Sequence, residues 1–153
     1  MTFQAIEHRL EPCGYACGAE WFNDSKATNP DAVFKAINAF GERPLVVLLG
    51  GRNKGNDFRP LAQAVAARAR AVVSFGEAGP QIAAAFEGTL AQPLNVPSMA
   101  AAVSAAAGLA RPGDAVVLSP ACASFDEFSN YEQRGRTFKE FVRALECSEG
   151  DAS

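Results

Sequence analysis

The sequence has one histidine and one tryptophan, no long apolar run, and nearly balanced charge. Lys and Arg number 14 and Asp and Glu 17, and the resulting net charge of −3 disfavours a general nucleic-acid or polybasic membrane binder. The longest apolar stretches, Leu45–Leu49 and Met99–Ala110, fall short of the ~20 residues that a membrane-spanning helix requires. The first eight residues lack the basic and apolar regions of a secretory signal. We therefore expect no nucleic-acid partner, no membrane partner and a cytoplasmic location.

Cysteine is also sparse, with four residues in the chain. Cys13 and Cys17 have the look of half a zinc site, but no second cysteine pair follows, and a structural zinc site needs four ligands. Reduced thiols are the favoured interpretation, and we expect no metal ligands in this chain. Cys122 could be a nucleophile only with an acid–base partner, and the single histidine, His8, lies at the other end of the sequence. We expect no catalytic residue here.

Two common nucleotide-binding motifs are absent. A glycine-rich stretch, 50–55, follows an apolar run, but Asn56 and Asp57 come next where a phosphate loop has Lys and Ser or Thr. No Gly-x-Gly-x-x-Gly occurs either. The chain therefore contains no self-contained nucleotide site of either kind. Lys54 stands on this stretch, and composition alone favours a solvated surface lysine there.

The apolar runs and turn residues predict a hairpin followed by alternating helices and strands. Asn29 before Pro30, for example, is a helix-start signal, and Ser98 is another. Helical crossovers between short apolar strands imply parallel pairing. We expect one α/β domain over residues 1–153: a three-layer sandwich with a Rossmann-like, mostly parallel sheet preceded by a short β-hairpin. The expected strands cover residues 9–13, 20–23, 44–49, 71–75, 90–96 and 115–118. The expected helices cover 30–40, 58–68, 80–86, 98–110 and 131–145, and residues 147–153 are expected to fray.

Ligands of such sheets bind beyond the carboxyl ends of the strands. The loops predicted at those ends are 24–29, 50–55, 76–79 and 119–130, and the polar and glycine signals concentrate in them. A helix N-terminus after the first of these loops could bind an anion. Its polar residues could equally serve as turn and cap residues.

Several stretches in a fixed order resemble the Mur ligases, the ATP-dependent amino-acid ligases of peptidoglycan synthesis. They are His8-Arg9, Asn-Asp-Ser-Lys-Ala-Thr-Asn at 23–29, Leu-Leu-Gly-Gly at 48–51 with Lys54, Leu-Ser-Pro-Ala-Cys-Ala-Ser at 118–124, and Glu-Gln-Arg-Gly at 132–135. Each is weak alone, but together they are specific and cover roughly residues 6–145. The similarity is to the carboxy-terminal domain of the D-glutamate-adding member. Sibling ligases usually have an Asp-Tyr-Ala-His-type segment where this chain has Asp-Ser-Lys-Ala at 24–27. The diaminopimelate- or lysine-adding sibling also has an Asp-Asn-Pro-Arg motif, which is absent here. Both differences favour the D-glutamate-adding member.

The resemblance implies a reaction that joins D-glutamate to UDP-N-acetylmuramoyl-L-alanine through an acyl phosphate. The family enzyme has three domains, and its central one holds ATP and magnesium for the most part. Neither of the other domains occurs in this chain. The resemblance thus implies that Met1 begins a fragment, and that this domain is inactive alone, binds D-glutamate and closes over ATP.

The resemblance also implies residue roles. On the D-glutamate side, Lys54 pairs with a carboxylate, Thr28 and Ser124 donate hydrogen bonds, and the backbone around Phe125 and the ring of Tyr131 complete the pocket. The family often has Phe at the position of Tyr131.

On the nucleotide side, the resemblance implies that Arg9 and Asp24 contact the ribose, that His8 lies near the adenine, and that Lys26 lies close to the phosphates. Two alternatives remain open at this point. The chain could be a free-standing small-ligand-binding module derived from such a domain, or a domain of a related ligase with another acceptor amino acid.

Overall fold

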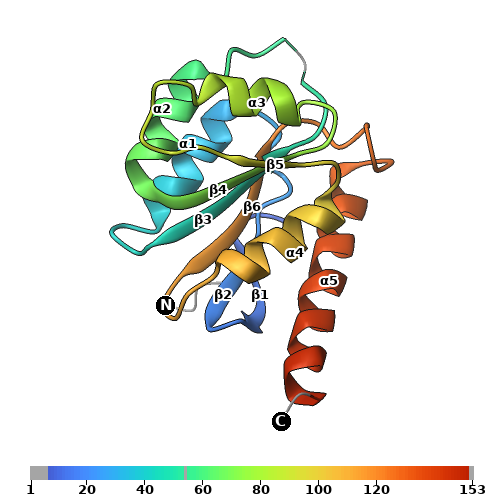
Figure 1. The fold of residues 1–153 in the computed structure, drawn as a ribbon. Coiled ribbons are helices and arrows are strands. Elements are labelled where there is room, and N and C mark those ends of the chain that lie inside the picture. Colours follow the sequence, from blue (N-terminus) through green and yellow to red (C-terminus); the bar gives the residue numbers. More distant parts are fainter. Residues whose placement is uncertain (1–6, 54, 152–153) are drawn as a thin grey trace, which may run out of the picture.

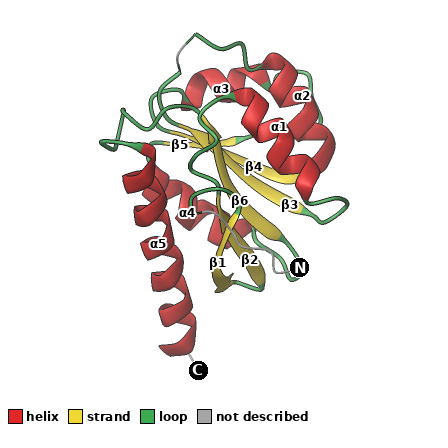
Figure 2. Ribbon diagram, turned by 180° about the vertical axis from the view of Figure 1, so that it is seen from behind, coloured by secondary structure: helices red, strands yellow, loops and turns green. Residues whose placement is uncertain are grey.

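The computed structural model describes residues 7–53 and 55–151, which form a twisted sheet between two layers of helices (Figures 1 and 2). The strand order in the six-stranded sheet is β1-β2-β6-β3-β4-β5. Only β1 and β2 pair antiparallel, and the other neighbours are parallel. The strands are β1 (Glu11–Ala16), β2 (Ala19–Asn23), β3 (Leu45–Gly50), β4 (Ala69–Phe75), β5 (Leu94–Val96) and β6 (Ala115–Ala121). The helices are α1 (Pro30–Ala39), α2 (Arg59–Arg68), α3 (Gly79–Ala85), α4 (Met99–Leu109) and α5 (Tyr131–Asp151).

The core has two halves, one on each face of the sheet. Every residue of β3 is buried. Val47 and Leu49 pack in the cluster that includes α1, α2 and α3, whereas Val46 and Leu48 pack in the cluster with α4 and α5. Successive side chains of a strand point to opposite faces, so a strand covered on both sides must be apolar throughout. The predicted three-layer α/β fold is confirmed.

Two helix starts follow the sequence signals. The Asn29 side chain accepts a hydrogen bond from the Ala32 N–H at 2.9 Å, and Pro30 is the first residue of α1. The Ser98 hydroxyl accepts one from the Ala101 N–H at 3.2 Å and begins α4. Each cap satisfies a backbone donor that a helix leaves free at its N-terminus.

The strand boundaries differ from the prediction by one residue in β2 and β3 and by two in β4, and by more in β1, β5 and β6. β1 begins at Glu11 because His8 and Leu10 have positive φ angles of 67° and 44°, which turn the backbone away from an extended path. β5 is reduced to Leu94–Val96 after Pro93, which has no N–H to donate to a ladder. β6 continues through Pro120, where its register with β3 shifts.

The last helix extends beyond its predicted end at residue 145 to Asp151, and its distal part projects past the sheet (Figure 1). Glu146 lies in this extension and accepts a hydrogen bond from the Tyr15 N–H at 2.9 Å. Because β1 is an edge strand, this contact satisfies a donor that the sheet leaves free. Among the described residues, no helix combines the length and apolar character needed to cross a membrane.

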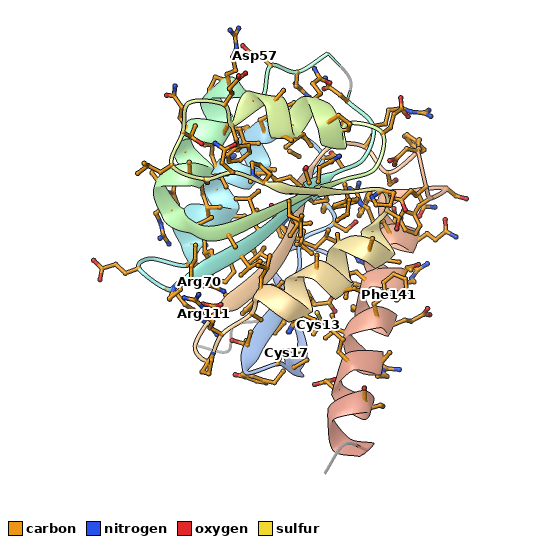
Figure 3. All side chains as sticks on the ribbon, in the orientation of Figure 1. Cys13, Cys17, Asp57, Arg70, Arg111 and Phe141 are labelled. Atoms are coloured by element: carbon orange, nitrogen blue, oxygen red, sulfur yellow. The ribbon has the colours of Figure 1, made fainter. Side chains whose placement is uncertain are left out.

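An ion pair between Arg70 and Asp114 lies at the amino ends of the parallel strands. Asp114 is 2% exposed, lies against the Arg70 guanidinium and accepts a hydrogen bond from the Arg111 N–H at 2.8 Å. Figure 3 shows Arg70 and Arg111 together at this edge, with Asp57 at the opposite end of the domain. The polar loops predicted to bind ligands lie at the other edge.

Candidate functional site

The loops after β2 and β6 are joined at the carboxyl edge by backbone hydrogen bonds. The Asp24 N–H donates to the Leu118 carbonyl at 2.8 Å, and the Ala121 N–H donates to the Ala27 carbonyl at 2.9 Å. Ala121 has a φ of 65°, which is unfavourable for a residue with a Cβ and marks a sharp change of direction. The two loops therefore form one continuous rim.

The loops after β3 and β4 join the same rim. Arg52 and Ala123 exchange two backbone hydrogen bonds, of 2.8 and 3.1 Å. The Ala78 N–H donates to the Gly51 carbonyl at 2.8 Å. The four loops that the sequence placed at this edge thus meet there, as expected for strands that run parallel.

Three of the four residues predicted for the nucleotide side line one pocket. Arg9, Asp24 and Lys26 surround a hollow of about 350 Å³, together with Asn29 and Lys35 of the α1 region. These three side chains come from the segment before β1 and the loop after β2. The hollow combines two carboxylates, those of Asp24 and Asp31, with several cations.

Asp24 is the buried member of this group, with 4% of its surface exposed. One carboxylate oxygen accepts from the Leu10 N–H at 3.1 Å and the other from the Ser119 hydroxyl at 2.9 Å. Burial raises the pKa of Asp24 to about 6, although both hydrogen bonds act in the opposite direction. At neutral pH the side chain is therefore mostly ionised, and it keeps lone pairs that can accept from hydroxyl groups.

His8 lies behind the rim and not in the pocket. Its Nδ1 is 2.9 Å from the Asn23 side-chain nitrogen, its ring meets Tyr131 edge-on at 5.9 Å, and 2% of the residue is exposed. Burial lowers the pKa of His8, so the ring is neutral at pH 7. Gly135 makes room for it, since a Cβ at that position would overlap the ring. In this conformation His8 supports the rim from within.

Four of the five residues predicted for the D-glutamate side lie on the same rim, and none of these four lines the pocket of Arg9, Asp24 and Lys26. Ser124 is buried, Phe125 is 51% exposed, and Tyr131 begins α5. Thr28 is half-buried and directly precedes the cap of α1. The fifth predicted residue, Lys54, lies outside the described residues.

Two carboxylates fix the loop that carries Ser124 and Phe125. Asp126 accepts a hydrogen bond from the Glu77 N–H at 3.0 Å, which ties the loop to the end of β4. Glu127 accepts from the Met99 N–H at 3.2 Å and so caps α4. The loop is therefore anchored at the two residues directly after Phe125.

Arg134, which has no functional role in the sequence-based prediction, is 1% exposed. Its Nε donates to the Ser25 hydroxyl at 2.9 Å and its Nη2 to the Ser25 carbonyl at 2.8 Å. Burial lowers the pKa of Arg134 to about 10, which leaves it charged at neutral pH. A sequence signal exists, because Arg134 precedes buried Phe138 and Val142 by one and two steps of four residues and so lies on the buried face of α5.

Thiol and metal chemistry gain no support from the described residues. Burial raises the pKa values of Cys13 and Cys122 to about 12, so neither is a thiolate at neutral pH. The Cys13 thiol donates to the Trp21 carbonyl at 3.4 Å. Within residues 7–53 and 55–151, no group of three or more His, Cys, Asp or Glu side chains is arranged to hold a metal ion.

Comparison with known proteins places this geometry in one family. A family model described as "Mur ligase, glutamate ligase domain" matches residues 8–122. The UDP-N-acetylmuramoylalanine–D-glutamate ligase of Thiobacillus denitrificans is 47% identical over 145 residues, covering 95% of this chain and 31% of that protein. The chain thus spans about a third of the length of this curated relative.

Solved structures show the same fold. A murein peptide ligase from Psychrobacter arcticus has a TM-score of 0.61 and 20% identity, covering 90% of this chain and 31% of that one. The bifunctional folylpolyglutamate synthase/dihydrofolate synthase of Yersinia pestis, solved with AMPPNP and a Mn ion, has a TM-score of 0.63 and 14% identity, covering 90% and 32%. With the family model matching most of the sequence, the chain belongs to the Mur ligase family, of which it contains the glutamate ligase domain.

Proposed function

We propose that this chain is the carboxy-terminal, D-glutamate-binding domain of a cytoplasmic ligase that adds D-glutamate to UDP-N-acetylmuramoyl-L-alanine. The observation that carries the proposal is the 47% identity, across nearly the whole chain, to an enzyme named for that reaction. The convergence of all four polar loops on one rim supports it. The rest of such an enzyme would supply the UDP-sugar site.

The chemistry defines what this domain must do. D-glutamate has to be held by its two carboxylates while its amine stays free to attack an activated carboxyl group. In the proposal Lys54 pairs with one carboxylate, and Thr28 and Ser124 donate hydrogen bonds to the ligand. The backbone at Phe125 and the ring of Tyr131 complete the wall. Such alignment lowers the barrier because it removes the entropy cost of bringing the reactants together.

The pocket of Arg9, Asp24 and Lys26 suits the nucleotide side of the reaction. Asp24 can accept hydrogen bonds from ribose hydroxyls, and Lys26 is an exposed cation that can approach phosphates. ATP, when bound, would supply the phosphoryl group that activates the carboxyl group of UDP-N-acetylmuramoyl-L-alanine as an acyl phosphate. Magnesium would be held mainly by the central domain. Closure of this domain over that one would exclude water from the reactive intermediate, so the domain alone should not turn over substrate.

The test is a titration of the ¹⁵N-labelled 153-residue chain with D-glutamate, followed by amide NMR. We expect saturable shifts confined to the rim loops and weaker binding of L-glutamate. Lys54→Ala should raise the Kd tenfold or more, because a charge-assisted hydrogen bond contributes roughly 1.5–3 kcal/mol. Lys35→Ala, which removes a cation from the nucleotide pocket, is the matched control and should leave the Kd unchanged.

No saturable shift with D-glutamate would refute the proposal. Equal or tighter binding of another amino acid would replace it with a related ligase that has a different acceptor. Formation of product from D-glutamate, ATP and UDP-N-acetylmuramoyl-L-alanine by the chain alone would show that the catalytic apparatus is not divided between domains as proposed.

A further inference from the structure

The Arg134 guanidinium lies at the junction of three rim loops. Its Nε and Nη2 both donate to Ser25, to the hydroxyl and to the carbonyl oxygen, at 2.9 and 2.8 Å. The two bonds come from one rigid planar group, so they fix the position and the orientation of the loop after β2 relative to α5.

Ser25 extends this contact to the start of α5. Its hydroxyl accepts from Arg134 and donates to the Tyr131 carbonyl at 2.7 Å. Its N–H donates to the Asn23 side chain at 3.1 Å, at the end of β2. The hydroxyl therefore uses both its donor and an acceptor position, and it fixes the loop after β2 against the start of α5.

The third loop passes close to the remaining nitrogen. Nη1 of Arg134 is buried and has no hydrogen-bond partner among the described residues. A Cβ on Gly51 would lie 3.1 Å from Nη1 and would also overlap the Ala123 carbonyl. Gly51 has a φ of 132°, a backbone conformation that favours glycine. The loop that leads to Lys54 thus passes directly against the guanidinium.

We propose that Arg134 is a positioning residue for ligand binding. It sets the spacing between the loop of Lys26 and Thr28 and the loops of Gly51 and Ser124, which together surround the substrate. The inference rests on the proposed function, because it assigns a ligand to these loops. Burying a charged side chain costs free energy, so a side chain that only filled this part of the core would be expected to be apolar.

The test compares Arg134→Lys with Arg136→Lys, a matched control at an exposed position on the same helix. Lysine keeps the charge but cannot make the two hydrogen bonds that the planar guanidinium donates to Ser25. We expect the Kd for D-glutamate to rise at least tenfold in Arg134→Lys. Hydrogen exchange should accelerate at least tenfold at the rim amides of Lys26 and Ala121, and less than threefold at amides between β3 and β4. Arg136→Lys should change neither quantity.

Two results would overturn the inference. An unchanged Kd in Arg134→Lys would leave the residue with a structural role only. A uniform acceleration of exchange across the sheet would show loss of global stability and not of loop position. If the unaltered chain binds no D-glutamate, the proposed function fails, and the contrast between rim and sheet exchange alone decides the positioning role.

A second variant covers the case in which Arg134→Lys does not fold. Ser25→Ala removes one hydroxyl and keeps the backbone carbonyl that Arg134 also contacts. We expect a Kd at least threefold higher and faster exchange at Ala121. Ser104→Ala, at an exposed position on α4, is its control. A Kd for Ser25→Ala equal to that of Ser104→Ala would likewise refute the inference.

Discussion

The charge of Asp24 should make the domain less stable as the pH rises. Burial raises the pKa of this carboxyl from 3.8 to about 6 in the folded chain. Between these two values the folded state holds a proton that the unfolded state has released. The stabilising contribution of the group is therefore complete below pH 3.8 and is lost as the pH rises through 6.

The size of the effect follows from the shift. A difference of about two pKa units lowers the free energy of unfolding by about 3 kcal/mol once the group is fully ionised in both states. Asp24→Asn is nearly isosteric and does not titrate. Its amide can still accept from the Leu10 N–H and can donate to the Ser119 hydroxyl. The difference in unfolding free energy between the two proteins thus isolates the carboxyl group.

Urea unfolding at a series of pH values measures this difference. Trp21 is the only tryptophan and is fully buried, so its fluorescence reports the transition. We expect the stability of the unaltered chain relative to Asp24→Asn to fall by about 2–2.5 kcal/mol between pH 4 and 7.5. A difference that stays constant over this range, or that rises with pH, would refute the reasoning about burial.

Two further predictions concern packing and thiol reactivity. Gly135→Ala should destabilise the chain by about 1–3 kcal/mol, because the new Cβ overlaps the buried ring of His8. Gly108→Ala, at a helical glycine with open space around it, should instead gain about 0.5–1 kcal/mol in the same unfolding assay; equal effects would refute the packing argument. Cys147 is exposed and should react rapidly with a disulfide reagent at pH 8, whereas buried Cys122 should react only in urea. Mass mapping of the labelled thiols tests this, and rapid labelling of Cys122 in the native chain would contradict it.

Local signals in the sequence were enough to place most elements. Asn29 and Pro30 begin a helix by capping chemistry that acts over three residues, and the structure contains that helix. The run from Leu45 to Leu49 predicts a strand buried on both faces, and β3 is that strand. Such signals operate between neighbours in the chain, which is why they can be read without a fold.

The ends of elements depended on contacts across the fold. Helix α5 continues past residue 145 to reach the edge strand, where Glu146 binds the Tyr15 N–H. The first strand starts later than predicted because Leu10 bends back and donates its N–H to Asp24. Partners that lie far away in the sequence decide such boundaries, and no local pattern contains them.

The candidate site, too, depends partly on local sequence and partly on contacts across the fold. The sequence by itself determined which loops follow the strands and which polar residues they carry, because strand and turn patterns are local. Only the tertiary structure decided that β2 lies beside β6, that His8 is sealed behind the rim, and that the Arg134 guanidinium meets Ser25. Burial and strand order result from packing the whole chain at once, so residues such as these acquire their environment only when the sheet and both helical layers have come together.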